Sequence, residues 1–106
     1  MLLNKNKPDA IFCANDTTAL SAILYLQENG IKIPEDIAIV GFSNEPFSEV
    51  VSPPISTIRQ PGFEMGKKAA ELIISQILNK EKETVFQTIT MPTELIIRKS
   101  SDKKQK

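Results

Sequence analysis

The sequence lacks histidine and tryptophan, and it contains one cysteine and four glycines among its 106 residues. Without histidine there is no imidazole base for a serine or cysteine nucleophile, and no imidazole ligand for a metal site. The scattered glycines form no phosphate-binding loop, and the carboxylates Asp16, Glu45 and Glu49 show no pairing around a scissile bond. We therefore expect no enzyme activity, no metal site and no cofactor.

An excess of charge of one sign is also absent, because thirteen basic residues balance thirteen acidic ones. Such a chain has no general cationic field for nucleic acid, and we expect this segment not to bind DNA by itself. No run approaches the ~20 apolar residues that span a bilayer, and residues 1–7 lack the hydrophobic core of a secretion signal. A lone cysteine, Cys13, fits a buried thiol in a reducing compartment. The expected location is cytoplasmic, without membrane partners.

Hydrophobic patterning in the first half predicts a β-α-β unit. Short apolar runs at 9–14 and 37–40 predict buried strands, since they are too short for helices. Between them a helix is expected to begin at Asn15 or Asp16 and to end at Asn29-Gly30, where glycine suits the left-handed cap. Such a unit predicts a parallel sheet with a right-handed crossover.

The second half predicts a short strand at 56–59, a helix from 61 to 78, and one or two strands within 85–97 interrupted at Pro92. One face of that helix is apolar and must pack on another surface. Its apolar residues are Met65, Ala69, Leu72, Ile73 and Ile77. The polar end, 99–106, is expected to be a disordered tail after a folded part at 1–98.

Polar residues follow each of the first three predicted strands, and carboxyl ends of parallel strands share the sheet edge where α/β folds bind ligands. Each has a simpler interpretation: a helix cap for Asn15, turn formation for Ser43 and Asn44, and solvation for Gln60. We expect Asp16 to cap the helix, which would free the Asn15 amide for a ligand hydroxyl. Their convergence favours an effector site of Asn15, Asp16, Ser43, Asn44 and Gln60.

Four sequence motifs occur in a fixed order along the chain: Cys13-Ala14-Asn15-Asp16-Thr17-Thr18-Ala19-Leu20, Ile39-Val40-Gly41-Phe42-Ser43-Asn44, Pro53-Pro54-Ile55-Ser56-Thr57-Ile58-Arg59-Gln60-Pro61, and Met91-Pro92-Thr93-Glu94-Leu95-Ile96-Ile97-Arg98. Together they resemble the C-terminal part of the effector domain in the lac repressor/galactose repressor (LacI/GalR) family of bacterial transcription regulators. The resemblance covers residues 8 to about 100. It implies an α/β fold, part of a periplasmic-binding-protein-like (type I) three-layer α/β/α sandwich with a mostly parallel sheet. The helix at 61–78 would then belong to one lobe and the surrounding strands to the other.

In the resembled family, the positions matching Asn15, Ser43 and Gln60 contact an effector in a cleft between the lobes. That effector is usually a sugar or another small metabolite. This sequence departs from the family at Ser43, where many members carry an aspartate. Losing that charge-assisted hydrogen bonding could change affinity by ~1 to 3 kcal/mol, which leaves the effector's identity open.

The apolar residues of the first helix spread over an arc of roughly 200°, wider than the stripe that covers one sheet face. The loop at 47–51 adds bulky apolar groups where polar residues are usual. Both could complete one core or form an interface, and the resemblance favours a homodimer. The expected interface residues are Leu20, Ile23, Leu24, Phe47, Val50 and Val51.

The sequence therefore predicts the effector-sensing and dimerisation segment of a LacI-type DNA-binding transcription regulator. Operator DNA would be contacted only through a helix-turn-helix headpiece that this chain lacks. The chain would be a fragment, and its uncovered apolar surfaces would favour self-association. The alternatives are a periplasmic sugar- or solute-binding protein of the same fold and a purely structural dimerisation module.

Overall fold

The computed structural model describes residues 6–79 and 87–103, and the chain divides into two compact units. Unit 2 is Gln60–Thr93, and unit 1 comprises the segments before and after it. The division falls where the sequence predicted a change of lobe, with the long helix in one unit and the surrounding strands in the other.

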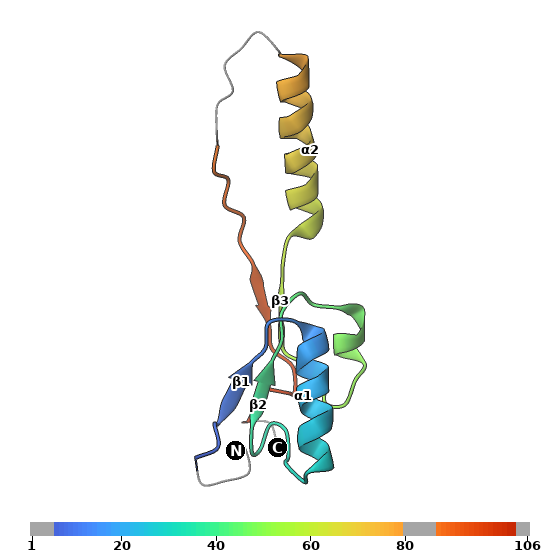
Figure 1. Ribbon diagram of the computed structural model, residues 1–106, viewed down its shortest axis with the longest axis vertical. Helices are drawn as coiled ribbons and strands as arrows, with labels where there is room; N and C mark the ends of the chain where they lie inside the picture. Colours follow the sequence, from blue (N-terminus) through green and yellow to red (C-terminus); the bar gives the residue numbers. More distant parts are fainter. Residues whose placement is uncertain (1–5, 80–86, 104–106) are drawn as a thin grey trace. The chain divides into compact units, whose positions relative to one another are not determined.

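Unit 1 contains the predicted β-α-β unit. Strand β1 (Ala10–Phe12) pairs in parallel with β2 (Ala38–Val40), and helix α1 (Asp16–Glu28) connects them. Helix α1 packs against this sheet (Figure 1). It ends at the C-cap Asn29, after which Gly30 takes a positive φ of 74° that glycine adopts without strain. The predicted strands, helix and parallel pairing are confirmed.

Unit 1 also contains a second two-stranded sheet after β2. The 3-10 helix η1 (Pro46–Glu49) follows β2 and leads to β3 (Thr57–Arg59), which pairs antiparallel with β4 (Glu94–Ile96). An isolated parallel bridge between Val40 and Ser56 joins the end of β2 to the start of β3. The fold is therefore a fragment of the expected α/β architecture with parallel strands.

The core of unit 1 consists of apolar side chains that α1, β2 and the connections between them bury. Each fully buried isoleucine or leucine contributes roughly 1.5 to 3 kcal/mol relative to an exposed one. The buried cluster is Cys13, Ala19, Ile23, Leu26, Ile31, Ile33, Ile37, Ile39 and Ile55.

The segment after β4 is not the disordered tail expected from its composition. Ser100 is fully buried; its Oγ donates to the Ile39 carbonyl at 2.6 Å and accepts from the Ser56 backbone N–H at 2.8 Å. A polar composition does not exclude burial, because a serine hydroxyl can form hydrogen bonds with buried backbone groups of a sheet. The prediction was wrong for 99–103, and residues 104–106 lie outside the described residues.

Unit 2 contains α2 (Gly62–Leu78). Helix α2 buries none of its residues, and Met65, Ile73 and Ile77 are each about half exposed. The expected apolar face is present, with Leu72 half-buried on it. Of the one or two strands predicted within 85–97, the structure contains only β4 among the described residues 87–97, and residues 85–86 are outside them.

Candidate functional site

The carboxyl ends of β1, β2 and β3 lie at one edge of unit 1, and backbone hydrogen bonds join them. The Asp16 N–H donates to the Phe42 carbonyl at 3.1 Å, and the Ser43 N–H donates to the Ile58 carbonyl at 3.0 Å. The polar residues after β1 and β2, including Asn15 and Asn44, are therefore brought to the same edge. This is the edge at which open α/β sheets bind ligands.

Asn15 is the N-cap of α1. Its Oδ1 accepts from the Thr18 N–H at 2.8 Å, with extended backbone angles typical of a cap. The expectation that Asp16 would fill this role is wrong. Asn15 is exposed, and its Nδ2 donor is not used by the cap.

Asp16 is fully buried, and both of its carboxylate oxygens have protein partners. Oδ1 accepts from the Thr57 hydroxyl at 2.7 Å, and Oδ2 accepts from the Glu45 N–H at 2.6 Å. A Cβ added to Gly41 would lie 2.2 Å from Asp16 Oδ1, so only glycine fits against this carboxylate. Asp16, predicted to be an effector contact, instead ties α1, the loop after β2, and β3 together.

Ser43 and Asn44 have positive φ angles of 108° and 54°. Side chains disfavour this region, at a cost of roughly 1 to 3 kcal/mol per residue, although asparagine tolerates it better than most. The Asn44 N–H donates to the Thr57 Oγ1 at 3.1 Å, and the next N–H is held by Asp16. The network of Asp16 and Thr57 therefore holds the unusual backbone that presents Ser43 and Asn44.

Arg98, just beyond β4, reaches the same loop from the other side. Its side chain is only 14% exposed and donates from Nη1 to the Ser48 Oγ at 2.7 Å and the Ile55 carbonyl at 2.9 Å. From Nη2 it donates to the Asn44 Oδ1 at 3.1 Å. The sequence pattern predicted no role for Arg98 or Thr57. The only sequence signal was a single arginine at the end of an apolar strand.

Gln60 directly follows β3 and is the first residue of unit 2. It is exposed, and its carbonyl accepts from the Gly62 N–H at 2.8 Å as the chain enters α2. The structure thus groups Asn15, Ser43 and Asn44 within unit 1 and assigns Gln60 to the other unit.

The residues expected at a dimer interface differ in exposure. Ile23 is 1% exposed within the core and is not available to a second chain, which corrects that assignment. Three of the others, Leu20, Phe47 and Val51, are partly buried against the core. Leu24 and Val50 are 53% and 81% exposed, respectively.

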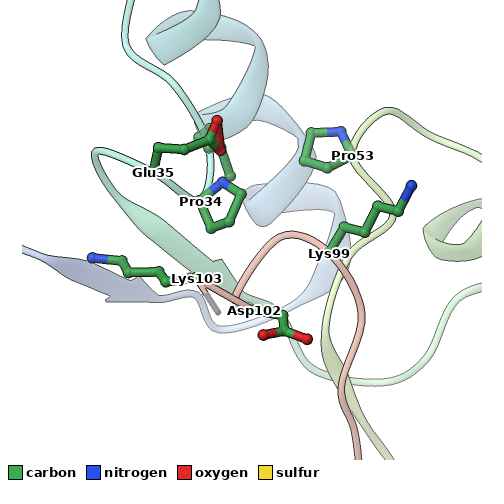
Figure 2. A pocket seen from close by; sticks show the side chains of 7 residues that line it. Pro34, Glu35, Pro53, Lys99, Asp102 and Lys103 are labelled. Atoms are coloured by element: carbon green, nitrogen blue, oxygen red, sulfur yellow. The ribbon is translucent and has the colours of Figure 1, made fainter. Parts of the chain in front are cut away.

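Two other features of unit 1 are weaker candidates for a site. A pocket of about 810 Å³ includes Glu35, Asp102, Lys99 and Lys103 in its lining (Figure 2). Its segment 33–35 precedes β2, at the opposite edge from the strand-end residues. Burial raises the pKa of the Cys13 thiol, which therefore stays protonated and unreactive at neutral pH.

Metal-ligand clusters and membrane-spanning helices were sought in the described ranges 6–79 and 87–103. No group of three or more cysteine, aspartate or glutamate side chains there is arranged to hold a metal ion. No helix in those ranges combines the length and apolarity that crossing a bilayer requires.

Comparison with known proteins shows the family. The profile described as "Periplasmic binding protein-like domain" matches residues 1–101. The HTH-type transcriptional repressor PurR of Vibrio parahaemolyticus is 42% identical over 100 residues, which cover 93% of this chain and 29% of that protein. The chain thus spans under a third of this relative's length. Such relatives are transcriptional repressors rather than enzymes.

Solved structures give the same result. The LacI family transcriptional regulator from Enterococcus faecalis V583, with bound ribose, is 40% identical with a TM-score of 0.79, covering 92% of this chain and 36% of that one. The putative transcriptional regulator LacI from Bacillus cereus subsp. cytotoxis has a TM-score of 0.85 at 29% identity, covering 93% and 34%. The chain therefore belongs to the periplasmic binding protein-like domain family, and it matches the effector-domain part of LacI-family transcription regulators.

Proposed function

We propose that this chain is the effector-sensing and dimerisation segment of a DNA-binding transcription regulator. The observation that carries the proposal is the edge formed by Asn15, Ser43 and Asn44, whose loop is held by the buried Asp16 and Thr57. A rigid loop favours ligand binding, because its residues are already ordered and lose little conformational entropy when the ligand binds. In the intact protein, Gln60 would join these residues in contacting the effector.

The proposed effector is a sugar or another small metabolite. The support comes from the Enterococcus faecalis relative, whose structure was solved with bound ribose. The donors and acceptors at the strand ends are neutral amide and hydroxyl groups, which suit a small polar molecule. The Asp16 carboxylate is buried and both of its oxygens accept hydrogen bonds from the protein, so it does not replace the charged acceptor that an aspartate in place of Ser43 would provide.

The proposed second role is homodimerisation through the outer side of α1 and the loop after η1. Leu24 and Tyr25 on α1 are more than half exposed, and Val50 after η1 is 81% exposed. The Gln27 Nε2 donates to the Ser52 carbonyl at 3.2 Å, which ties these two segments together. Solvent-exposed apolar side chains on adjoining elements are typical of an interface.

In the intact regulator the chain would transmit effector binding without contacting DNA. Binding would shift an equilibrium between two conformations, and the dimer interface would relay the change to headpieces that read the operator. Such a regulator acts in the cytoplasm and performs no catalysis.

The experiment that tests this function is calorimetric melting of the chain with D-ribose and with a panel of other sugars and nucleosides. A ligand at 100 times its dissociation constant stabilises the native state by ~2.7 kcal/mol, which for a domain of this size is a shift of roughly 10 °C or more. We expect one compound of the panel to raise the melting temperature of the wild-type chain.

Two variants of one residue separate ligand binding from helix capping. Asn15→Asp keeps the cap oxygen and removes the Nδ2 donor, so it should melt like the wild type but lose the ligand shift. Asn15→Ala removes both and should also lower the unliganded stability by about 1 kcal/mol. An Asn15→Asp variant that keeps the full ligand response would refute the assignment.

The exposed apolar residues of α1 favour one competing function, a module that only dimerises. In that case the chain would be a dimer by light scattering, and no compound of the panel would raise its melting temperature. The strand-end polar residues would then be turn formers only.

A further inference from the structure

The guanidinium of Arg98 contacts the candidate effector site through the Asn44 side chain. Its Nη2 donates to Asn44 Oδ1 at 3.1 Å, while Nη1 is anchored by Ser48 Oγ at 2.7 Å and the Ile55 carbonyl at 2.9 Å. Both anchors belong to the connection between β2 and β3, so the guanidinium is fixed at two points before it reaches Asn44. Because the guanidinium is nearly buried and its donors are fixed in a planar fork, it determines the orientation of the Asn44 side-chain amide.

The orientation of the amide determines whether Asn44 Oδ1 or Nδ2 remains available to a ligand. Arginine has donors only, so the amide atom facing it must be the oxygen; the flipped amide would place N–H against N–H. The Ser48 Oγ also lies 3.5 Å from the same oxygen. No hydrogen bond described within 6–79 and 87–103 uses Asn44 Nδ2, and no fully buried side-chain N or O atom there lacks a partner, so this nitrogen is not fully buried.

In Asn15, too, the side-chain oxygen is occupied and the nitrogen remains as a donor, although a different contact is responsible. Its Oδ1 accepts from the Thr18 N–H at 2.8 Å, which leaves Nδ2 as the side-chain group available to a ligand. The carboxylate of Asp16, next to Asn15 in the sequence, is fully buried with both oxygens bonded. The two asparagines therefore offer donors at this edge.

We propose that Arg98 is a positioning residue for the effector site, because it turns the Asn44 amide so that Nδ2 donates to an acceptor oxygen of the effector. The inference rests on the proposed function and narrows the ligand class. A carbonyl or carboxylate oxygen satisfies such a donor completely, whereas a hydroxyl needs a further acceptor for its own proton. An ammonium group at that point is rejected, since it has donors only and would face another donor.

The positioning step can be tested without any ligand. Side-chain ¹⁵N relaxation reports the order parameter of the Asn44 amide on the ps–ns timescale. In the wild-type chain we expect a rigid amide, and in Arg98→Met a mobile one. Arg98→Lys is a second variant in case Arg98→Met fails to fold. It keeps the charge but not the planar fork of donors, so the order parameter of the Asn44 amide should be intermediate.

Glu49→Gln serves as the matched control. Glu49 Oε1 lies 3.5 Å from Arg98 Nη2 and its side chain is 70% exposed, so neutralising it should leave the Asn44 order parameter unchanged. An Asn44 amide that stays rigid in both Arg98 variants would overturn the inference.

The donor role is tested with three five-carbon probes: D-ribonate, D-ribose and 1-amino-1-deoxy-D-ribitol. They present a carboxylate, a hydroxyl and an ammonium group at the same carbon. The wild-type chain should bind D-ribonate most tightly and the amine least. Asn44→Asp keeps an oxygen for Arg98 but loses the donor, so it should weaken D-ribonate binding by roughly tenfold to a hundredfold and improve binding of the amine.

The two failures are distinguishable. If Arg98→Met loosens Asn44 but the order of the three probes is unchanged in Asn44→Asp, the donor assignment is overturned. If Arg98→Met loosens Asn44 and none of the three probes binds the wild-type chain, the proposed effector function for this class of ligand is contradicted, while the positioning of Asn44 by Arg98 stands.

Discussion

Replacing Asp16 with asparagine tests the network that holds the strand-end loop. The substitution preserves shape but leaves one acceptor where two are used, by the Thr57 hydroxyl at 2.7 Å and by the Glu45 N–H at 2.6 Å. If the new amide oxygen accepts from the Glu45 N–H, the amide NH2 group faces the Thr57 hydroxyl. That hydroxyl oxygen already accepts from the Asn44 N–H, and its proton can no longer be donated to residue 16. One charge-assisted hydrogen bond is then lost.

The expected cost follows from that loss. A hydrogen bond to a charged group contributes about 1.5 to 3 kcal/mol. Asp16 also lies in the first turn of α1, where a negative charge is worth about 0.3 to 1 kcal/mol. We therefore expect Asp16→Asn to lower the free energy of unfolding by roughly 2 to 4 kcal/mol.

Urea titration followed by circular dichroism and by the fluorescence of Tyr25, the single tyrosine, measures this change. With a dependence of ~2 kcal/mol per molar urea, in the middle of the typical range, the midpoint should fall by about 1 to 2 M. Asp36→Asn is the matched control, because Asp36 accepts a single N–H, from Lys32 at 2.9 Å, in an exposed setting. An Asp16→Asn midpoint as close to wild type as that of Asp36→Asn would show that the Asp16 hydrogen bonds do not stabilise the fold.

Three further predictions concern packing, assembly and titration. Gly41→Ala would place a Cβ 2.2 Å from Asp16 Oδ1 and should lower thermal stability by ~1 to 3 kcal/mol or more, whereas Gly66→Ala, with open space around its Cβ, should stabilise α2 by about 0.5 to 1 kcal/mol. Leu24→Asp should yield monomers by light scattering, and a retained dimer would contradict the proposed interface. Because burial raises the Cys13 thiol pKa, the folded state favours the protonated form; stability should be constant below the ordinary thiol pKa of ~8.5 and fall above it. The free energies of unfolding of the wild type and of Cys13→Ser are compared over the same pH series. If stability does not fall at alkaline pH in Cys13→Ser, ionisation of the Cys13 thiol is the cause of the decrease in the wild type.

The regular elements could be predicted from sequence because each is specified locally. The runs around β1 and β2 are apolar and too short for helices, and α1 begins at an asparagine cap and ends at Asn29-Gly30. Residues that follow parallel strands reach one edge whatever their packing. The strand pattern alone is therefore enough to bring Asn15, Ser43 and Asn44 to that edge.

The roles that depend on long-range contacts could not be predicted. Asp16 bonds to Thr57 across 41 positions, and Arg98 reaches Asn44 across 54. Nothing local distinguishes a buried aspartate from a capping one, or a buried serine such as Ser100 from one in a polar tail. Likewise, the apolar arc of α1 did not show that Ile23 faces the core and Leu24 the solvent, because that depends on where the sheet lies.

We propose above all that the carboxyl edge of unit 1 binds a small-molecule effector. The most direct test is a ¹H–¹⁵N NMR titration of the chain with whichever panel compound raises the melting temperature, beginning with D-ribose. We expect shift changes centred on Asn15, Ser43 and Asn44. Changes centred instead on the pocket that Glu35, Lys99 and Lys103 help to line, at the opposite edge, would contradict it.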